Sequence, residues 1–200
     1  MYGFRKNIKA ITYLNFPLCT LLLIIAKPLI ELLYGSKWDP AVPYFQLLCI
    51  SGMLYSMNSL NGSVVKALGK GKVYFTLTFT QRAIGLVLMF LGIRYSVKGL
   101  LIAVITSEFI NYFLFSIANG RLLGYGLWLQ LKDVFFCLII SVFVGVVVFY
   151  CGKMMSMHPY LVMVIQVIIY VCLFAGISAL FKIEGYYTYK DVVKQLINHR

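Results

Sequence analysis

The sequence predicts an all-α protein, a polytopic integral membrane helix bundle with six transmembrane helices and cytoplasmic N- and C-termini. Hydrophobic residues make up 62% of the chain and charged residues 12%, whereas soluble domains average about 45–50% apolar and about 25% charged residues. Mean hydropathy is +0.89. Several apolar runs exceed the roughly 20 residues that a helix needs to cross a bilayer. These observations place the chain in the membrane class.

The six predicted spans alternate with short connections, and a polar tail, residues 182–200, follows the last span. The first span contains Pro17 and Pro28, and the second opens with DPAVP and becomes polar in its second half. A longer connection, residues 119–133, contains glycines and Trp128 and so predicts an interfacial elbow between two groups of helices. The spans are residues 11–34, 41–66, 73–93, 97–118, 134–151 and 159–181.

The distribution of Lys and Arg predicts the orientation of the chain. With a cytoplasmic N-terminus, the inside segments hold twelve Lys and Arg residues and the outside segments five. Cytoplasmic segments of membrane proteins carry such an excess, so both termini are expected inside. A basic face beside anionic lipid also explains much of the +12 net charge. We therefore expect membrane lipids among the partners, and no nucleic acid.

The segment SLNGSVVKALGKGKVYF, residues 59–75, has the glycines and the Gly-Lys pair of a phosphate-binding loop, but not its spacing. A Walker A loop reads G-x-x-x-x-G-K-[ST]. Here six residues separate Gly62 from Gly69, and Gly71 follows Lys70 where Ser or Thr is required. The segment instead predicts the cytoplasmic end of a helix that stops at Gly69.

The second span carries a polar face. Asn58 belongs to a set that recurs at helical spacing, and Asn61 follows it by three residues. Amides within a membrane span need hydrogen-bond partners on other helices or a water-filled cavity. Helix-to-helix hydrogen bonding and a polar lumen both satisfy this requirement. The full set is Ser51, Tyr55, Asn58 and Gly62.

Two charged residues lie near the middle of predicted spans. Arg82 is in the third span, and Glu108 is in the fourth, with Ser107 and Asn111 close by. A charge at this depth costs several kcal/mol, so it normally faces the protein interior and finds a partner. The residues are expected either to form a structural ion pair or to line a substrate path in which Arg82 holds an anionic group. Arg82 shares its helix face with Thr78, Gln81 and Gly85.

The chain lacks the residue patterns of an enzyme or a metal site. It has six acidic residues, without paired carboxylates, a nucleophile elbow or an HExxH motif. His158 and His199 belong to no metal-ligand pattern, and no two of the five cysteines form CxxC. We expect the cysteines to act as small buried hydrophobic residues. The expectation is a protein that is not an enzyme and uses no metal or cofactor.

Residues 28–75 resemble the C-terminal half of bacterial polysaccharide transporters of the lipid-linked oligosaccharide flippase type. This family belongs to the multidrug/oligosaccharidyl-lipid/polysaccharide exporter superfamily. The likeness covers about residues 5–120 well and continues more loosely to about residue 181. Its elements are Tyr34-Gly35, Trp38, Ala67-Leu68-Gly69, a basic residue partway along the next span (Arg82), and the glycine-led span VKGLLIAVITSEFINYF.

The resemblance implies part of a larger two-lobed exporter fold, of which this chain has only the C-terminal portion. Residues 1–120 would supply four helices of the C-terminal lobe, residues 121–181 an accessory helix pair, and residues 182–200 a cytoplasmic tail. We therefore expect a truncated or split gene product, with a separately encoded N-terminal lobe as a candidate partner.

The resemblance also implies a substrate. It would be an undecaprenyl-diphosphate-linked oligosaccharide, flipped across the bacterial inner membrane for O-antigen, capsule or exopolysaccharide synthesis. Arg82 would meet the diphosphate, with Lys66 near the cytoplasmic mouth. Asn58, Asn61 and Gln81 would contact the sugars, and Glu108 would line the same path. The alternatives are a cation-coupled multidrug exporter of the same superfamily, and a non-transporting membrane scaffold or remnant in a glycan-assembly complex.

Overall fold

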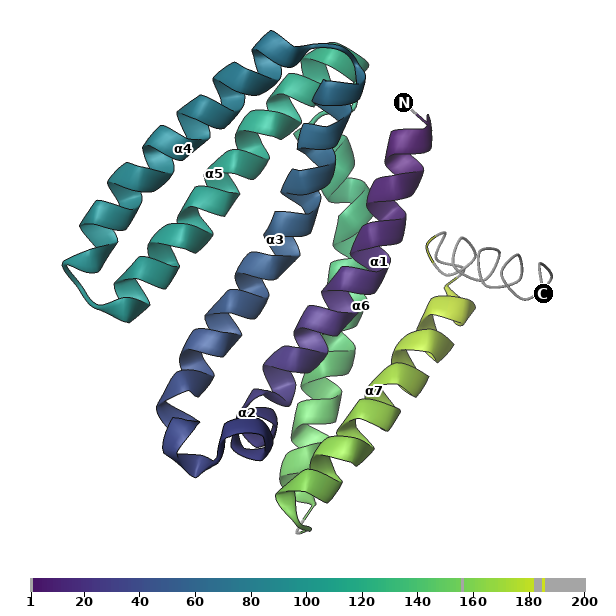
Figure 1. Ribbon diagram of the computed structural model, residues 1–200. Coiled ribbons are helices and arrows are strands. Elements are labelled where there is room, and N and C mark those ends of the chain that lie inside the picture. Colours follow the sequence, from purple (N-terminus) through teal and green to yellow (C-terminus); the bar gives the residue numbers. More distant parts are fainter. Residues whose placement is uncertain (1, 156, 182–184, 186–200) are drawn as a thin grey trace, which may run out of the picture. The chain divides into compact units, whose positions relative to one another are not determined.

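The computed structural model describes residues 2–155, 157–181 and 185 (Figure 1). Throughout these residues the regular structure is helical, without a strand, which confirms the predicted all-α class. The predicted tail, residues 182–200, lies outside the described residues except for Gly185. The elements are α1 (Tyr2–Ile24), α2 (Ala26–Tyr34), the 3-10 helix η1 (Ser36–Ala41), α3 (Val42–Ala67), α4 (Gly71–Ile93), α5 (Val97–Leu123), α6 (Leu127–Met154) and α7 (Pro159–Leu180).

Five described helices are long and apolar enough to cross a membrane: α1 from Gly3, α4, α5, α6 and α7. Helix α3 is not among them, although its 26 residues correspond to a length of about 39 Å. The reason is its composition, because serines and asparagines interrupt its second half. A multi-pass helical membrane protein is thus confirmed, whereas the sixth span and the orientation of the termini stay predictions.

The predicted first span, residues 11–34, is not one helix. Helix α1 begins at Tyr2, passes through Pro17 and ends at Ile24, and α2 follows after a bend at Ile25. Pro28 explains the break, because it lacks an N–H and its ring clashes with the carbonyl of the residue four positions earlier, Ile24. Residues 11–34 therefore form a long helix followed by a short one in a different direction.

The predicted elbow, residues 119–133, is much shorter than expected. Helix α5 continues to Leu123, and α6 begins at Leu127. Gly124 ends α5 in the left-handed conformation, with φ of +71°, which glycine adopts without steric cost. Most of the segment is therefore helical, because the residues on both sides of this turn favour a helix.

Residue contacts divide the chain into two compact units. The first contains the described part of residues 1–8 and Pro43–Lys132, and so includes nearly all of α3 together with α4 and α5. The second contains Lys9–Val42 and the described residues after Lys132, and so includes most of α1 and α6 together with α2 and α7. The domain boundaries proposed from the sequence stay predictions.

Small residues bring helices close together in the first unit. Helices α4 and α5 form an antiparallel hairpin (Figure 1). A Cβ atom added to Gly99 would lie 2.6 Å from the carbonyl oxygen of Gly92, and one added to Gly85 would lie 3.1 Å from the Ser107 hydroxyl. Such close backbone approach is the usual way in which small residues stabilise helix pairs in a membrane.

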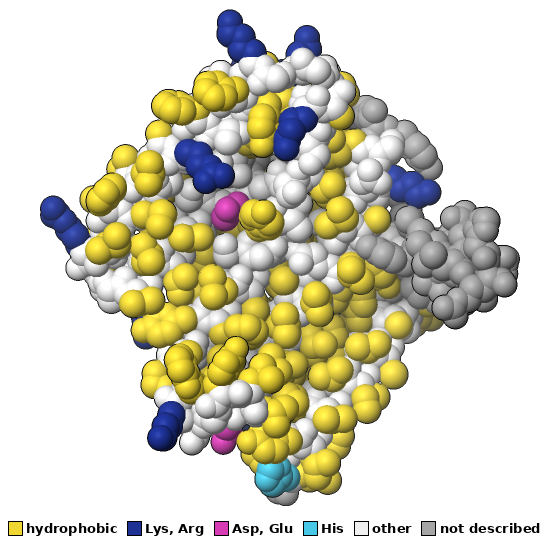
Figure 2. All heavy atoms as spheres, in the orientation of Figure 1, with side chains coloured by type: hydrophobic (Ala, Val, Ile, Leu, Met, Phe, Trp, Pro, Cys, Tyr) yellow, Lys and Arg dark blue, Asp and Glu magenta, His cyan; other side chains and the backbone are white. Residues whose placement is uncertain are grey.

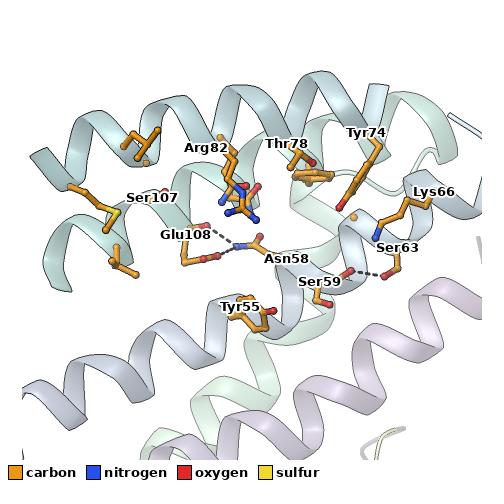
Figure 3. Close-up of a pocket in the computed structure, with 18 residues that line it drawn as sticks. Tyr55, Asn58, Ser59, Ser63, Lys66, Tyr74, Thr78, Arg82, Ser107 and Glu108 are labelled. Carbon is orange, nitrogen blue, oxygen red and sulfur yellow. Dashed lines mark hydrogen bonds between the residues drawn. The ribbon is translucent and has the colours of Figure 1, made fainter. Parts of the chain in front are cut away.

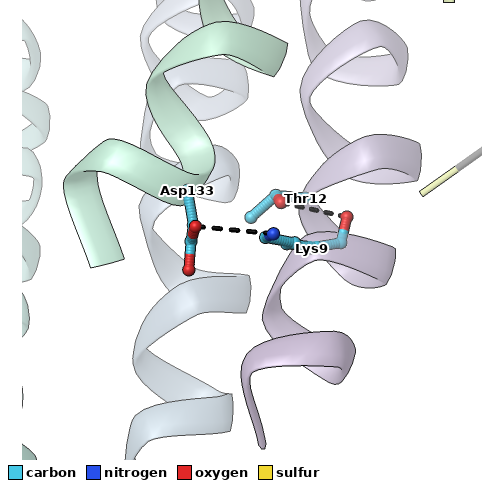
Figure 4. Close-up of polar contacts among 3 residues, drawn as sticks. All are labelled: Lys9, Thr12 and Asp133. Atoms are coloured by element: carbon cyan, nitrogen blue, oxygen red, sulfur yellow. Dashed lines mark hydrogen bonds and ion pairs between the residues drawn. The ribbon is translucent and has the colours of Figure 1, made fainter. Parts of the chain in front are cut away.

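Polar contacts join helices within the second unit. The Lys9 ammonium of α1 lies 3.5 Å from the Asp133 carboxylate of α6 (Figure 4). These side chains are only 17% and 5% exposed, respectively. The Tyr170 hydroxyl of α7 donates a 3.2 Å hydrogen bond to the Ser141 carbonyl of α6. The structure thus gives Lys9, a basic residue near the N-terminus, an acidic partner.

The distribution of polarity is that of a membrane protein. Hydrophobic side chains cover much of the face in Figure 2, and many large ones are more than half exposed, including Phe75, Phe90 and Leu180. Several amides and hydroxyls are instead buried. Lipid is as apolar as these exposed side chains, whereas buried polar groups need hydrogen-bond partners inside the protein. The buried polar residues include Asn58, Asn61, Asn111, Ser116, Asn119 and Gln130.

Candidate functional site

A polar cavity of about 560 Å³ lies within the first unit, between α3, α4 and α5 (Figure 3). Its volume falls in the range of about 300–1,000 Å³ that is common for small-molecule sites. Polar side chains from all three helices line it, together with a few apolar ones. The cavity is thus a candidate binding site, and two of the helices that line it, α4 and α5, are apolar enough to cross a membrane.

One face of α3 supplies the first wall. This face contains Tyr55, Asn58 and Gly62, whose helical spacing had predicted a common face, whereas Ser51 of the same stripe does not line the cavity. Positions three or four residues apart lie on one side of a helix. The residues of α3 that line the cavity are Tyr55, Asn58, Ser59, Gly62, Ser63 and Lys66.

Helices α4 and α5 supply the opposite walls. The stripe predicted on α4, from Thr78 through Arg82 to Gly85, faces the cavity as a whole. Helix α5 contributes Glu108 and the two polar residues near it. The lining residues are Tyr74, Thr78, Gln81, Arg82, Gly85, Leu86 and Met89 from α4, and Val104, Ser107, Glu108, Asn111 and Phe115 from α5.

The cavity brings together all but one of the residues proposed from the sequence. Asn61 is the exception, because it points into a separate buried cluster. Three polar residues that line the cavity, Ser59, Ser63 and Tyr74, were not proposed. Tyr74 precedes Thr78 by one helical turn, so the same spacing argument could have found it. The proposed residues that line the cavity are Asn58, Lys66, Gln81, Arg82 and Glu108.

Glu108 receives an amide partner from α3. The Asn58 side-chain nitrogen donates hydrogen bonds to the Glu108 carboxylate at 2.6 Å and to the Glu108 backbone carbonyl at 3.0 Å. Asn58 is 5% exposed. A hydrogen bond to a charged group is stronger than one between neutral groups. This contact therefore fixes α3 against α5 and holds the carboxylate at the cavity wall.

Arg82 and Glu108 share the cavity but form no ion pair among the residues that the structure describes. The Arg82 side chain is exposed and extends toward the side of the cavity where Glu108 and Asn58 lie (Figure 3). Because an arginine remains charged at all physiological pH values, it offers a planar set of donors to an anion. The structure shows no structural ion pair between these two described residues, and the substrate path stays a prediction.

Tyr74 forms part of the cavity wall near Lys66. The Lys66 ammonium lies 4.6 Å from the centroid of the Tyr74 ring, a cation–π distance. The ring also packs against Phe115, with centroids 6.0 Å apart. A Cβ atom on Gly62 would be 3.3 Å from the Tyr74 ring, so glycine leaves room for it. This arrangement positions a second cation at the cavity.

Asn61 belongs to a fully buried amide cluster. Its side chain exchanges two hydrogen bonds with the Gln130 amide, at 3.1 and 2.9 Å. It also accepts a 2.7 Å hydrogen bond from Asn119, and Ser116 donates to Gln130 at 3.0 Å. All four residues are 0% exposed. The cluster joins α3, α5 and the start of α6, and its hydrogen bonds give it a structural role.

Comparisons with known proteins agree with this picture. A family model described as "Polysaccharide biosynthesis protein" matches residues 2–43. A Klebsiella pneumoniae protein described as an uncharacterized membrane protein in the cps region is 35% identical over 110 residues, which cover 54% of this chain and 23% of that protein. The chain is thus similar to membrane proteins of polysaccharide biosynthesis over part of its length.

Two further relatives of this chain have more specific descriptions. The Escherichia coli (strain K12) lipopolysaccharide biosynthesis protein WzxC is 30% identical over 73 residues. The Bacillus subtilis (strain 168) teichuronic acid biosynthesis protein TuaB is 34% identical over 73 residues. Each match covers 36% of this chain and 15% of the relative. No solved structure matches.

The chain spans less than a quarter of the length of these curated relatives. The predicted resemblance to polysaccharide biosynthesis membrane proteins is nevertheless confirmed.

Proposed function

We propose that this chain forms part of a flippase that moves undecaprenyl-diphosphate-linked oligosaccharide repeat units across the bacterial inner membrane. The product would serve O-antigen, capsule or exopolysaccharide synthesis. The observation that carries the proposal is the polar cavity between α3, α4 and α5, which holds Arg82 and Lys66 together with amides and hydroxyls.

The chemistry of such a substrate suits the cavity. A diphosphate carries negative charge that must leave water when the lipid crosses the membrane, and cations in a polar cavity lower that cost. Arg82 provides a bidentate donor for phosphate oxygens, and Lys66 a second positive charge. Asn58 and Gln81 would hydrogen-bond with the sugars. The exposed apolar surface of α4 would face lipid, beside the polyprenyl chain.

The proposal includes the topology of the chain. Both termini would be cytoplasmic, so the α3–α4 turn with Lys66 would also be cytoplasmic. The lipid-linked substrate is made of parts from the cytoplasm, so a cation at this end of the cavity would meet its diphosphate first. A separately encoded N-terminal lobe would complete the transporter.

A cation-coupled multidrug exporter is the main alternative. Such a protein needs acidic residues in its cavity for the cation or a basic drug. In the described part of the chain, the cavity has two basic side chains and one carboxylate, Glu108, which Asn58 already contacts. This balance of charge supports an anionic substrate. The scaffold alternative requires no cavity at all.

The test is a set of arginine variants in the organism that encodes the chain. The gene is deleted and complemented with the wild type, Arg82→Ala, Arg82→Lys or Arg94→Ala, and surface polysaccharide is measured. We expect a loss of at least tenfold for Arg82→Ala and partial activity for Arg82→Lys. Arg94 follows α4 and does not line the cavity, so its variant is the matched control. Normal surface polysaccharide in Arg82→Ala, at equal protein level, would refute the proposal.

A further inference from the structure

Two buried carbonyl oxygens at the cavity lack a hydrogen-bond partner among the described residues. They are Oδ1 of Asn58 and Oδ1 of Asn111. The two side chains are 5% and 7% exposed, and both line the cavity. A buried acceptor without a donor is unfavourable, and such groups in native proteins normally have a protein, water or ligand partner.

The orientation of the Asn58 amide follows from its surroundings. Its nitrogen donates to both the carboxylate and the backbone carbonyl of Glu108, and neither of these groups can donate to an amide oxygen when the carboxylate is ionised. If the amide nitrogen and oxygen of Asn58 were exchanged, its oxygen would lie beside two other acceptors, the carboxylate and the backbone carbonyl of Glu108. The Asn58 oxygen therefore lies on the side away from Glu108, as Figure 3 shows.

Asn111 extends the same wall along α5. It follows Glu108 by three residues, so the two lie on one face of the helix. We call Asn58, Glu108 and Asn111 the acceptor wall, because each lines the cavity and carries a side-chain oxygen that can accept a hydrogen bond. Arg82 and Lys66, in contrast, present only donors. One cavity thus combines groups that bind an anion with groups that bind hydroxyl or N–H donors.

We propose that the acceptor wall binds the sugar next to the diphosphate, and that it selects a neutral or N-acylated sugar over a uronic acid. This inference rests on the proposed function. Sugar hydroxyls and the N–H of an acetamido group can donate to the two amide oxygens. The carboxylate of a uronic acid would instead meet three acceptors, one of them the Glu108 carboxylate. Repulsion of this kind is an effective source of specificity.

Binding to the purified full chain in lipid nanodiscs tests the proposal. The probes are a short-chain polyprenyl diphosphate carrying N-acetylglucosamine, the same lipid diphosphate without sugar, and the same lipid diphosphate carrying glucuronic acid. We expect the N-acetylglucosamine probe to bind about tenfold more tightly than the other two, which corresponds to one or two hydrogen bonds.

The variants separate the acceptor wall from the cations. In Asn111→Leu, leucine has a volume similar to that of asparagine but no acceptor. This variant should bind the N-acetylglucosamine probe about three- to tenfold more weakly and the sugar-free probe as tightly as the wild type does. Asn111→Ser, which keeps a smaller acceptor, should have an intermediate effect. Arg82→Gln should weaken the binding of all three probes. Unchanged binding of the sugar-free probe also shows that the variant is folded.

The outcomes distinguish this inference from the proposed function. If the wild type binds the three lipid diphosphates equally, the acceptor wall has no role in selection, while the flippase proposal stands. The same conclusion follows if the Asn111 variants keep the wild-type preference, because the amide oxygens then have water as their partner. If none of the three probes binds, both proposals are refuted.

Discussion

At the scale of single residues, helical spacing predicted most of the cavity but not the direction of every side chain. Asn58, Arg82 and Glu108 share the cavity because each lies on a polar stripe of its helix. Asn61 is rotated by about 60° from Asn58 around the α3 axis, which is enough to direct it toward Gln130 instead. The sequence could not predict this contact, because Gln130 lay in a segment that was expected to be a loop.

The amide cluster around Asn61 should be important for stability. Gln130→Leu removes two hydrogen bonds of Asn61 and the hydrogen bond that Ser116 donates to Gln130, so buried polar groups lose partners. We expect the free energy of unfolding to fall by about 1–3 kcal/mol. The measurement is reversible unfolding of the purified chain in mixed micelles.

Gln81→Leu is the matched control for that measurement. Gln81 lines the cavity and is only partly buried, so its replacement should change the unfolding free energy by less than about 0.5 kcal/mol. Equal effects of the two variants would contradict the structural role assigned to the cluster.

At the scale of helices, close backbone contacts should decide the geometry of the α4–α5 hairpin. Gly99→Ala would place a Cβ atom 2.6 Å from the Gly92 carbonyl oxygen, and a backbone atom cannot move aside as a flexible side chain can. The hairpin must therefore open locally, at a cost of about 1–3 kcal/mol in unfolding free energy.

The control for the hairpin is Gly176→Ala in α7. No atom lies within 4 Å of a Cβ added there, and alanine favours a helix by about 0.5–1 kcal/mol over glycine. This variant should be neutral or stabilising in the same unfolding measurement. If Gly99→Ala behaves in the same way, the close approach of α4 and α5 does not contribute to stability.

Helix boundaries were predictable only in part. The predicted span at 73–93 agrees with both ends of α4 to within two residues. The span at 97–118 agrees with the start of α5, whereas α5 continues to Leu123. The break at Ile25 follows from Pro28, although the sequence predicted one span over residues 11–34. The early start of α6 could not be inferred from the glycines and polar residues before it.

At the scale of the whole molecule, the membrane class was predictable from composition, whereas the number of crossings depends on α3. If α3 crosses the membrane, the α3–α4 turn is cytoplasmic and the α4–α5 turn is external. If α3 does not cross, these two sides are exchanged, given the same N-terminus. A single helix of intermediate polarity thus determines the topology of everything after it.

Cysteine labelling distinguishes these topologies. In a chain whose five cysteines are replaced by alanine, Tyr95→Cys and Gly71→Cys each introduce one label site. Tyr95 is 82% exposed, and Gly71 has no neighbour within 4 Å of an added Cβ. With six spans, a membrane-impermeant maleimide added to intact cells should label Tyr95→Cys and not Gly71→Cys. With a cytoplasmic N-terminus, the reverse pattern would show that α3 does not cross.

The hydrogen bonds of α3 also have a consequence for biogenesis. Asn58 donates to Glu108, and Asn61 bonds with Asn119 and Gln130, so the partners of both amides come later in the chain. During synthesis, α3 leaves the ribosome before these partners exist. If α3 crosses the membrane, its insertion into the bilayer would be completed together with α4, α5 and the first turn of α6, and a nascent chain that stops before Gln130 would lack one partner of Asn61.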